Sequence, residues 1–108
     1  MMKYLLFLIS LSVYAQNEQH YINKYCSENL AYTATVAVDC LTAEYAIEFD
    51  FSHKWAEAIG QSLYYALQTN KKPAIFIICK NHLCNKHLHK LNTTIAHYQL
   101  QIQVFHGS

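Results

Sequence analysis

Three acidic side chains lie close together in the sequence, in a segment that is otherwise mostly apolar. Asp39 falls near the end of one predicted strand, and Glu48 and Asp50 lie on the next. Successive side chains of a strand alternate between its faces, so Glu48 and Asp50 are expected to point the same way. Carboxylates in apolar surroundings are costly unless a cation lies among them. Oxygen ligands in a set of two or three suit Mg²⁺, so these three residues predict a site for Mg²⁺ or Mn²⁺.

A predicted amphipathic helix follows these strands, with polar side chains on one arc and apolar side chains on the other. The polar arc contains Lys54, Glu57, Gln61, Tyr65 and Gln68, and the apolar arc contains Trp55, Ile59, Leu63 and Ala66. We expect Lys54 to point back toward the strand ends, where its ammonium group can stabilise developing negative charge. The competing interpretation is that Glu48 and Asp50 face solvent and that Lys54 pairs with one of them on the surface.

The remaining sequence patterns predict the elements that must hold these residues. Helices are expected at 17–29 and 84–98, and a long helix is expected between an N-cap at Ser52 and a loop at 69–73. Strands are expected at 32–38, 45–51, 74–79 and 100–105, with a turn at 41–44. The order α-β-β-α-β-α-β predicts the α/β (α+β) class, with a mixed sheet flanked by helices.

The beginning of the chain has the pattern of an export signal. Residues 1–15 start with Lys3, continue with an apolar run too short to span a bilayer comfortably, and end in the small-x-small sequence of Val13 and Ala15. Cleavage would leave a single domain at 16–108, in the periplasm or secreted, with no stable membrane insertion; an uncleaved anchor is the alternative. The mature chain is close to neutral, which excludes nucleic-acid binding through a strong bulk charge.

Four cysteines make an even set, and in an exported protein this favours disulfides. Cys26, Cys40, Cys79 and Cys84 allow three pairings. One of them closes the short loop from Cys79 to Cys84 and leaves Cys26 with Cys40. Buried free thiols are an alternative. Zinc binding by Cys79 and Cys84 with His82, His87 and His89 is another, although their spacing is not a standard zinc pattern.

The order of these motifs resembles the PD-(D/E)XK nuclease superfamily, and within it the RecB-type exonucleases. The resemblance is carried by Asp39, the sequence Glu48-Phe49-Asp50, and a helix with Gln61-x-x-x-Tyr65. The longer blocks VDCLTAEYAIEFDFSHKWAEAIGQSLYYALQTNKKPAIFII and LNTTIAHYQLQI are similar to a group of small exported bacterial proteins with this core. The resemblance covers about residues 26–105 and implies a restriction-endonuclease-like fold.

The resemblance also implies roles for single residues. Asp39 and Glu48 match the two acidic Mg²⁺ ligands, and Asp50 stands where the family usually has lysine. Gln61 and Tyr65 match the helix motif that orients the substrate, and Glu57 lies on the same arc. A second departure from the family is that residues 31–39 leave little room for its usual first hairpin, so the first strand should be short or missing.

These observations predict an exported, metal-dependent phosphodiester hydrolase acting on nucleic acid, or a degenerate relative of one. The alternative is a non-catalytic, disulfide-stabilised binding module for a protein partner whose identity the sequence does not indicate.

Overall fold

Four strands form one mixed sheet in the order β1-β2-β3-β4. The computed structural model describes residues 17–30 and 37–108, so the predicted signal at 1–15 lies outside the described residues. Strand β1 spans Cys40–Leu41, β2 Tyr45–Phe51, β3 Lys72–Ile78 and β4 Gln103–Gly107. Strand β1 is antiparallel to β2, whereas β2, β3 and β4 run parallel to one another. The parallel strands carry the long connections through helices that parallel pairing requires.

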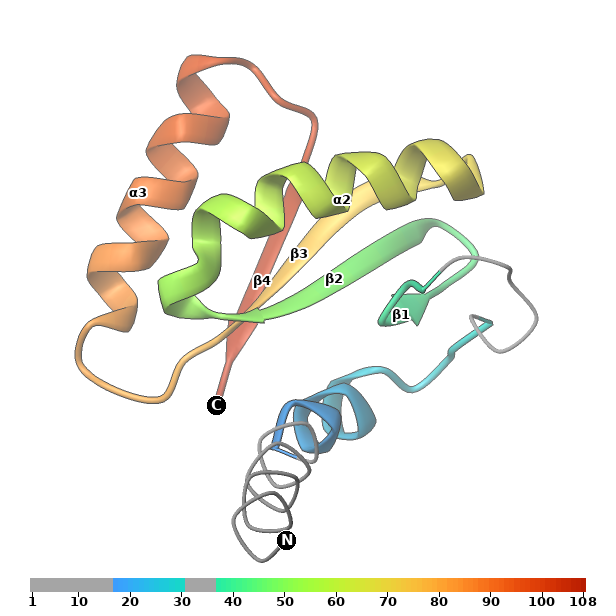
Figure 1. Ribbon diagram of the computed structural model, residues 1–108, viewed down its shortest axis with the longest axis horizontal. Coiled ribbons are helices and arrows are strands. Elements are labelled where there is room, and N and C mark those ends of the chain that lie inside the picture. The colour runs from blue at the N-terminus through green and yellow to red at the C-terminus, as the bar shows by residue number, and fades with distance from the viewer. Residues whose placement is uncertain (1–16, 31–36) are drawn as a thin grey trace, which may run out of the picture.

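Three helices in the described residues flank this sheet. Residues 17–25 form the first helix. A 3₁₀ turn, η2 (Ser52–Lys54), leads into the second helix, α2 (Trp55–Thr69). The third helix, α3, spans Cys84–His97. Helices α2 and α3 lie on one side of the sheet and the helix at 17–25 lies on the other (Figure 1). The predicted α+β class, with a mixed sheet flanked by helices, is therefore confirmed.

The two faces of the sheet bury different kinds of side chain. On the side of the first helix, Ile22 packs against Phe49, Phe51, Phe76 and Ile78. The rings of Phe49 and Phe76 stack with their centroids 4.6 Å apart. On the other side, Ile75 and Ile77 of β3 pack against Ala58 of α2 and Leu91 of α3. Alternation along β3 thus supplies both cores, as expected for a strand buried on both faces.

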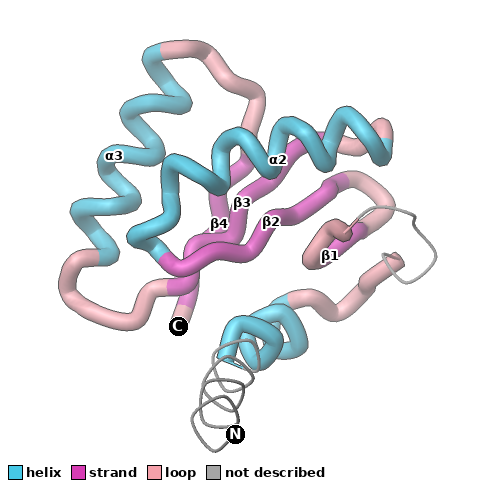
Figure 2. Tube along the Cα trace, in the orientation of Figure 1, coloured by secondary structure: helices cyan, strands magenta, loops and turns pink. Residues whose placement is uncertain are grey.

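The last turn of the helix at 17–25 contacts the C-terminal end of the chain, next to the edge strand β4 (Figure 2). The Tyr25 hydroxyl and the Lys24 ammonium each donate a hydrogen bond to the Ser108 carbonyl, at 2.7 Å. A side chain at Gly107 would come within 2.7 Å of the Tyr25 hydroxyl oxygen. Glycine at this position therefore lets the first helix pack closely against the end of β4.

Three local predictions are wrong in whole or in part. Residues 32–36 of the strand expected at 32–38 lie outside the described residues, but Ala37 and Val38 are not in a strand. The first strand of the described residues is the two-residue β1. Ser52 is not the N-cap of α2, because its hydroxyl bonds His87 instead and a 3₁₀ turn intervenes. Leu63 is 38% exposed, because α2 buries the adjacent arc of Ala58, Ser62 and Ala66.

The disulfide pairing of Cys26 with Cys40 and of Cys79 with Cys84 is confirmed. The zinc alternative is wrong, because the second bridge uses both of the thiols that such a site would need. The first bridge fastens the helix at 17–25 to β1. The second closes the loop between β3 and α3.

We expect Leu91→Ala to lower the free energy of unfolding by about 2–5 kcal/mol, because Leu91 is fully buried between α3 and the sheet. The same change at Leu67, which is 78% exposed on α2, should stay within about 0.5 kcal/mol of wild type. Chemical denaturation of both variants measures the difference. Equal effects would contradict this description of the core.

Candidate functional site

The carboxylate of Asp39 completes the edge of the sheet where β1 stops. Strand β1 pairs Cys40 with Ile47 and Leu41 with Ala46, and Asp39 lies in the bend directly before it. The next backbone donor on this edge of β2 is the Phe49 N–H, which donates to Asp39 Oδ2 at 2.9 Å. A side-chain oxygen therefore takes the place of the backbone carbonyl that a longer first strand would have supplied.

This hydrogen bond brings Asp39 against Glu48. Extending the register of β1 by one residue places Asp39 opposite Glu48, and cross-strand neighbours of this kind share one face of the sheet. The two carboxyl groups are hydrogen-bonded to each other. Burial, followed by the charges of Asp39 and Asp50, raises the pKa of Glu48 to about 9. Burial also raises the pKa of Asp39, whereas its hydrogen bonds with the Phe49 N–H and with Glu48 lower it. These opposing effects favour the proton on Glu48, with Asp39 as the acceptor.

Asp50 lies on the same face of β2 as Glu48 and is only 6% exposed. Burial, followed by the charge of Glu18, raises the pKa of Asp50 to about 7, and the Lys54 ammonium opposes this shift. Lys54 also lowers the pKa of Glu18. Lys54 thus lies close to both carboxyl groups, as expected for a side chain that points back toward the strand ends.

Glu18 is a fourth carboxylate of this site that the sequence did not indicate. It lies in the helix at 17–25, and burial together with the charge of Asp39 raises its pKa. Its charge in turn raises the pKa values of Glu48 and Asp50. The stripe of Tyr21 and other apolar residues predicts this helix, but nothing in the sequence says which strand its first turn approaches.

The polar arc of α2 contributes unequally to the site. Tyr65 is half-buried, and burial followed by the charges of Glu48 and Asp39 raises its pKa, so its phenol lies near the carboxyl pair. The charge of Glu57 also contributes to the raised pKa of Asp50. Gln61 is exposed. Of the three predicted orienting residues, Tyr65 lies close to the pair of Asp39 and Glu48, and Glu57 lies within electrostatic reach of Asp50.

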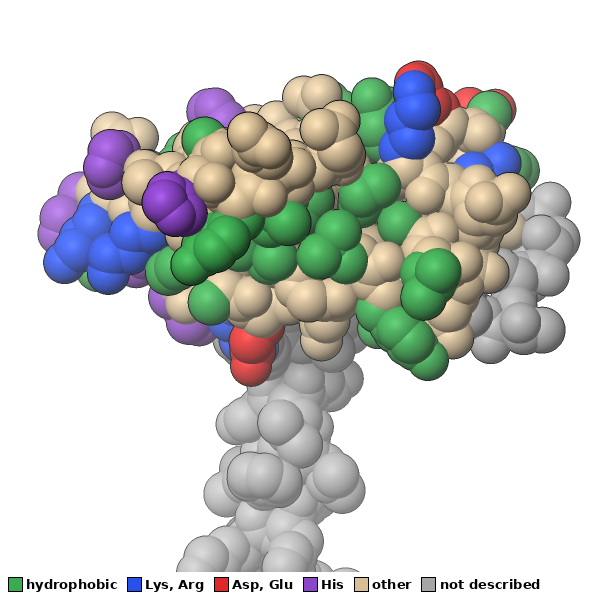
Figure 3. All heavy atoms as spheres, turned by 90° about the horizontal axis from the view of Figure 1, so that it is seen from above, with side chains coloured by type: hydrophobic (Ala, Val, Ile, Leu, Met, Phe, Trp, Pro, Cys, Tyr) green, Lys and Arg blue, Asp and Glu red, His purple; other side chains and the backbone are tan. Residues whose placement is uncertain are grey.

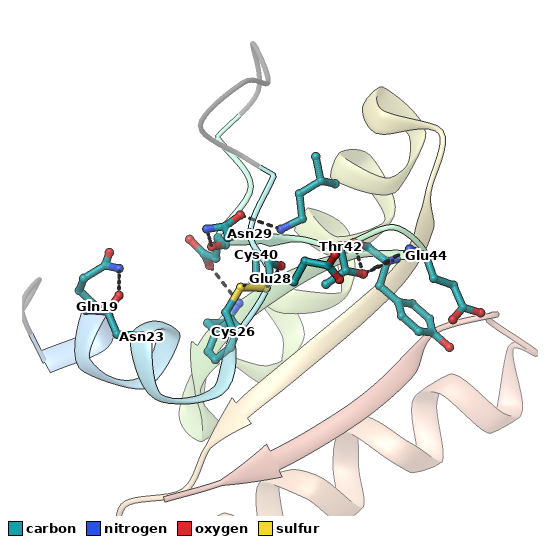
Figure 4. The surroundings of a disulfide bond; sticks show 12 residues. Gln19, Asn23, Cys26, Glu28, Asn29, Cys40, Thr42 and Glu44 are labelled. Atoms are coloured by element: carbon teal, nitrogen blue, oxygen red, sulfur yellow. Dashed lines mark hydrogen bonds between the residues drawn. A yellow bond between two sulfur atoms is a disulfide. The ribbon is translucent and has the colours of Figure 1, made fainter.

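Covalent and polar contacts hold the segment that carries Asp39 (Figure 4). The Cys26–Cys40 disulfide fixes the residue next to Asp39. The Asn29 side chain accepts the Leu41 N–H at 3.1 Å and donates to the Asp39 carbonyl at 3.3 Å. Asn29 and the disulfide therefore hold Asp39 and the short strand β1 that follows it, which limits how far the Asp39 carboxylate can move.

The donor chemistry of this site fits Mg²⁺ through two carboxylates. Mg²⁺ keeps several waters and commonly binds through only one or two carboxylates, and a cation between Asp39 and Glu48 would replace the proton that they share. In residues 17–30 and 37–108, no three His, Cys, Asp or Glu side chains are arranged as a set that could hold a metal ion. Asp50 would therefore contribute through water, or after a side-chain movement.

No family model, curated protein or solved structure shows a significant match to this chain. Within the described part of the chain, none of the helices is both long enough and apolar enough to span a bilayer. The two disulfides and this small mixed fold are compatible with an extracellular location.

We expect the free energy of unfolding to fall as pH rises from about 5 to about 8. A carboxyl whose pKa is raised on folding keeps its proton in the folded state and loses it in the unfolded state, so unfolding is favoured as pH increases. The effect begins near the ordinary glutamate pKa and is complete above the folded value of about 9. For Glu48 alone the slope can reach about 1.4 kcal/mol per pH unit.

Replacing Glu48 with glutamine should flatten this pH dependence and stabilise the protein most at the alkaline end. Glu44→Gln is the matched control, because Glu44 is exposed and pairs with Lys72 away from the carboxyl cluster. Denaturant titrations across the pH range measure both variants. A Glu48→Gln variant that keeps the wild-type slope would show that the pair holds no extra proton.

Proposed function

We propose that this protein is a divalent-cation-dependent phosphodiester hydrolase that acts on nucleic acid. The observation that carries the proposal is the pair of half-buried Asp39 and buried Glu48, hydrogen-bonded to each other, with buried Asp50 on the same face. Such a pair is destabilising without a cation, because burial raises the pKa of both carboxyl groups and the charge of Asp39 raises that of Glu48 further. The similarity to PD-(D/E)XK nucleases supports the same assignment for these positions.

Asp39 and Glu48 would hold Mg²⁺ or Mn²⁺, with Asp50 bound directly or through water. When bound, the cation would polarise the phosphodiester and lower the pKa of a coordinated water. Hydrolysis joins a water oxygen to phosphorus, breaks one P–O ester bond, removes a proton from the water and delivers one to the leaving oxygen. Asp50 would accept the first proton if it holds the cation only through water, since its pKa of about 7 suits proton transfer near neutrality.

Lys54 supplies the positive charge that the family usually places at the Asp50 position. Its ammonium lies within electrostatic reach of Asp50 and Glu18, where it would offset the negative charge that develops on the phosphate. Tyr65 lies near the carboxyl pair and could donate a hydrogen bond to a phosphate oxygen. We infer that the protein acts in the periplasm or outside the cell, as the predicted signal at 1–15 and the disulfides suggest.

The competing function is a non-catalytic, disulfide-stabilised binding module. The observation that favours it is that the described residues contain no preformed three-ligand metal group. In that case the pair of Asp39 and Glu48 would remain from an active ancestor, and the protein would function with the pair sharing a proton and binding no cation.

We expect millimolar Mg²⁺ or Mn²⁺ to raise the melting temperature of the wild type, because a ligand that binds the folded state alone stabilises it by mass action. Asp39→Asn should abolish this shift, whereas Glu44→Gln should keep it. Differential scanning calorimetry with and without EDTA makes the comparison. A wild-type melting temperature that ignores both cations would favour the binding module.

Lys54→Met should leave the cation-dependent shift in melting temperature largely intact. It should lower the rate of cleavage of a labelled oligonucleotide by a factor of about 100 or more, because this is the usual effect of losing one charge-stabilising group. Lys71→Met, a lysine whose ammonium bonds the Ala43 carbonyl away from the site, is the control and should cleave like wild type. Cleavage by Lys54→Met at the wild-type rate would exclude Lys54 from the reaction.

A further inference from the structure

The charges of this chain are divided between its two halves. All of its acidic residues lie between Glu18 and Glu57, and residues 58–108 contain none. The same residues 58–108 contain a set of cationic or cation-forming side chains: Lys71, Lys72, Lys80, Lys86, Lys90, His82, His87, His89, His97 and His106. A chain that is nearly neutral overall therefore has a locally cationic half.

Much of this cationic character gathers on the loop at 79–84 and the first turns of α3. Lys80, Lys86 and Lys90 are all exposed there, together with His82 and His89. Figure 3 shows lysine and histidine side chains grouped at the end of the molecule where α3 lies. We call this group, with Asn81 and His87, the α3 cationic surface.

The loop in this surface has a fixed conformation. The Cys79–Cys84 disulfide closes it, and the Asn81 side chain accepts the Leu83 N–H at 2.9 Å. The Cys79 N–H donates to the Gly107 carbonyl at 2.8 Å, which fastens the start of the loop to β4. A loop held in this way loses little conformational entropy when it binds a ligand.

A small cavity opens beside the loop, at the carboxyl ends of the parallel strands β2 and β3. It has a volume of about 180 Å³ and is lined by Phe51, Ser52, His53, Ile78, Lys80 and Asn81. The carboxyl ends of parallel strands are the usual ligand position in open α/β sheets. A cavity of this size suits a single phosphate group better than a drug-sized molecule.

The α3 cationic surface is coupled to the strand that carries the acidic pair. The Ser52 hydroxyl and His87 Nδ1 are hydrogen-bonded at 2.8 Å, which links the end of β2 to α3. Ser52 follows Asp50 by two residues, a span of about 7 Å in extended chain. This span is close to the axial rise of two nucleotides, at about 3.4 Å each, so one strand could place phosphates that are two nucleotides apart at the two sites.

We propose that the α3 cationic surface binds the phosphate backbone of a nucleic acid strand, with one phosphate in the cavity beside Lys80. The proposal rests on the proposed function for the identity of the polyanion. Binding itself needs neither a divalent cation nor cleavage. Charge complementarity identifies the ligand, because clustered lysines in a segment without acidic residues release counterions from a polyanion when they bind it.

The test is fluorescence anisotropy of a labelled single-stranded oligonucleotide with the purified protein in EDTA. The triple variant Lys80→Gln/Lys86→Gln/Lys90→Gln should bind about tenfold more weakly or worse at low salt. It should also make the negative slope of log affinity against log salt less steep by about 2, which corresponds to the loss of three phosphate contacts. The control triple Lys24→Gln/Lys71→Gln/Lys72→Gln removes the same charge elsewhere and should keep the wild-type slope.

Other outcomes would overturn the proposal. Equal losses in the two triples would mean that net charge alone governs binding, and no loss in either would exclude the α3 cationic surface. Tight binding to phosphatidylglycerol vesicles without binding to the oligonucleotide would assign the surface to a membrane. A protein that binds the oligonucleotide through these lysines yet never cleaves it would preserve this inference and contradict the proposed hydrolase.

Discussion

The hydrogen bond from the Phe49 N–H to the Asp39 carboxylate is the interaction on which the acidic edge of this protein depends. Strand β1 has only two residues, so β2 would otherwise expose an unpaired donor beside its acidic face. By filling that position with a side chain, the fold completes its edge and brings Asp39 against Glu48 in one step. The arrangement that closes the sheet also creates the proton-sharing pair.

Such a pair is tolerable only because the surrounding contacts leave it little freedom to separate. The Cys26–Cys40 disulfide and the Asn29 side chain hold the segment that carries Asp39. Phe49, whose N–H donates to Asp39, is held by its aromatic stack with Phe76 on the other face of the sheet. Retention of a proton by Glu48 reduces the electrostatic cost further, since two adjacent charges become one.

Both candidate sites lie toward the carboxyl end of β2, and they carry opposite charge. The acidic pair and Asp50 form one of them. The disulfide-closed loop and α3 form the other, and the hydrogen bond between Ser52 and His87 connects the two. A polyanionic substrate needs this combination, because lysines supply binding energy along its backbone while a cation held by carboxylates acts at one phosphate.

The sequence by itself determined the order of the elements, the mixed sheet and the alternation that puts Glu48 and Asp50 on one face of β2, because these follow from local periodicity. It also indicated Lys54 as their neighbour, one turn into the helix. Only the tertiary structure decided which arc of α2 is buried, and hence the exposure of Leu63, because that choice depends on where the sheet lies. The approach of Glu18 and the pairing of Asp39 with Phe49 were likewise decided by contacts between segments far apart in the chain. Sequence spacing carries no information on the distance between such segments once the chain folds.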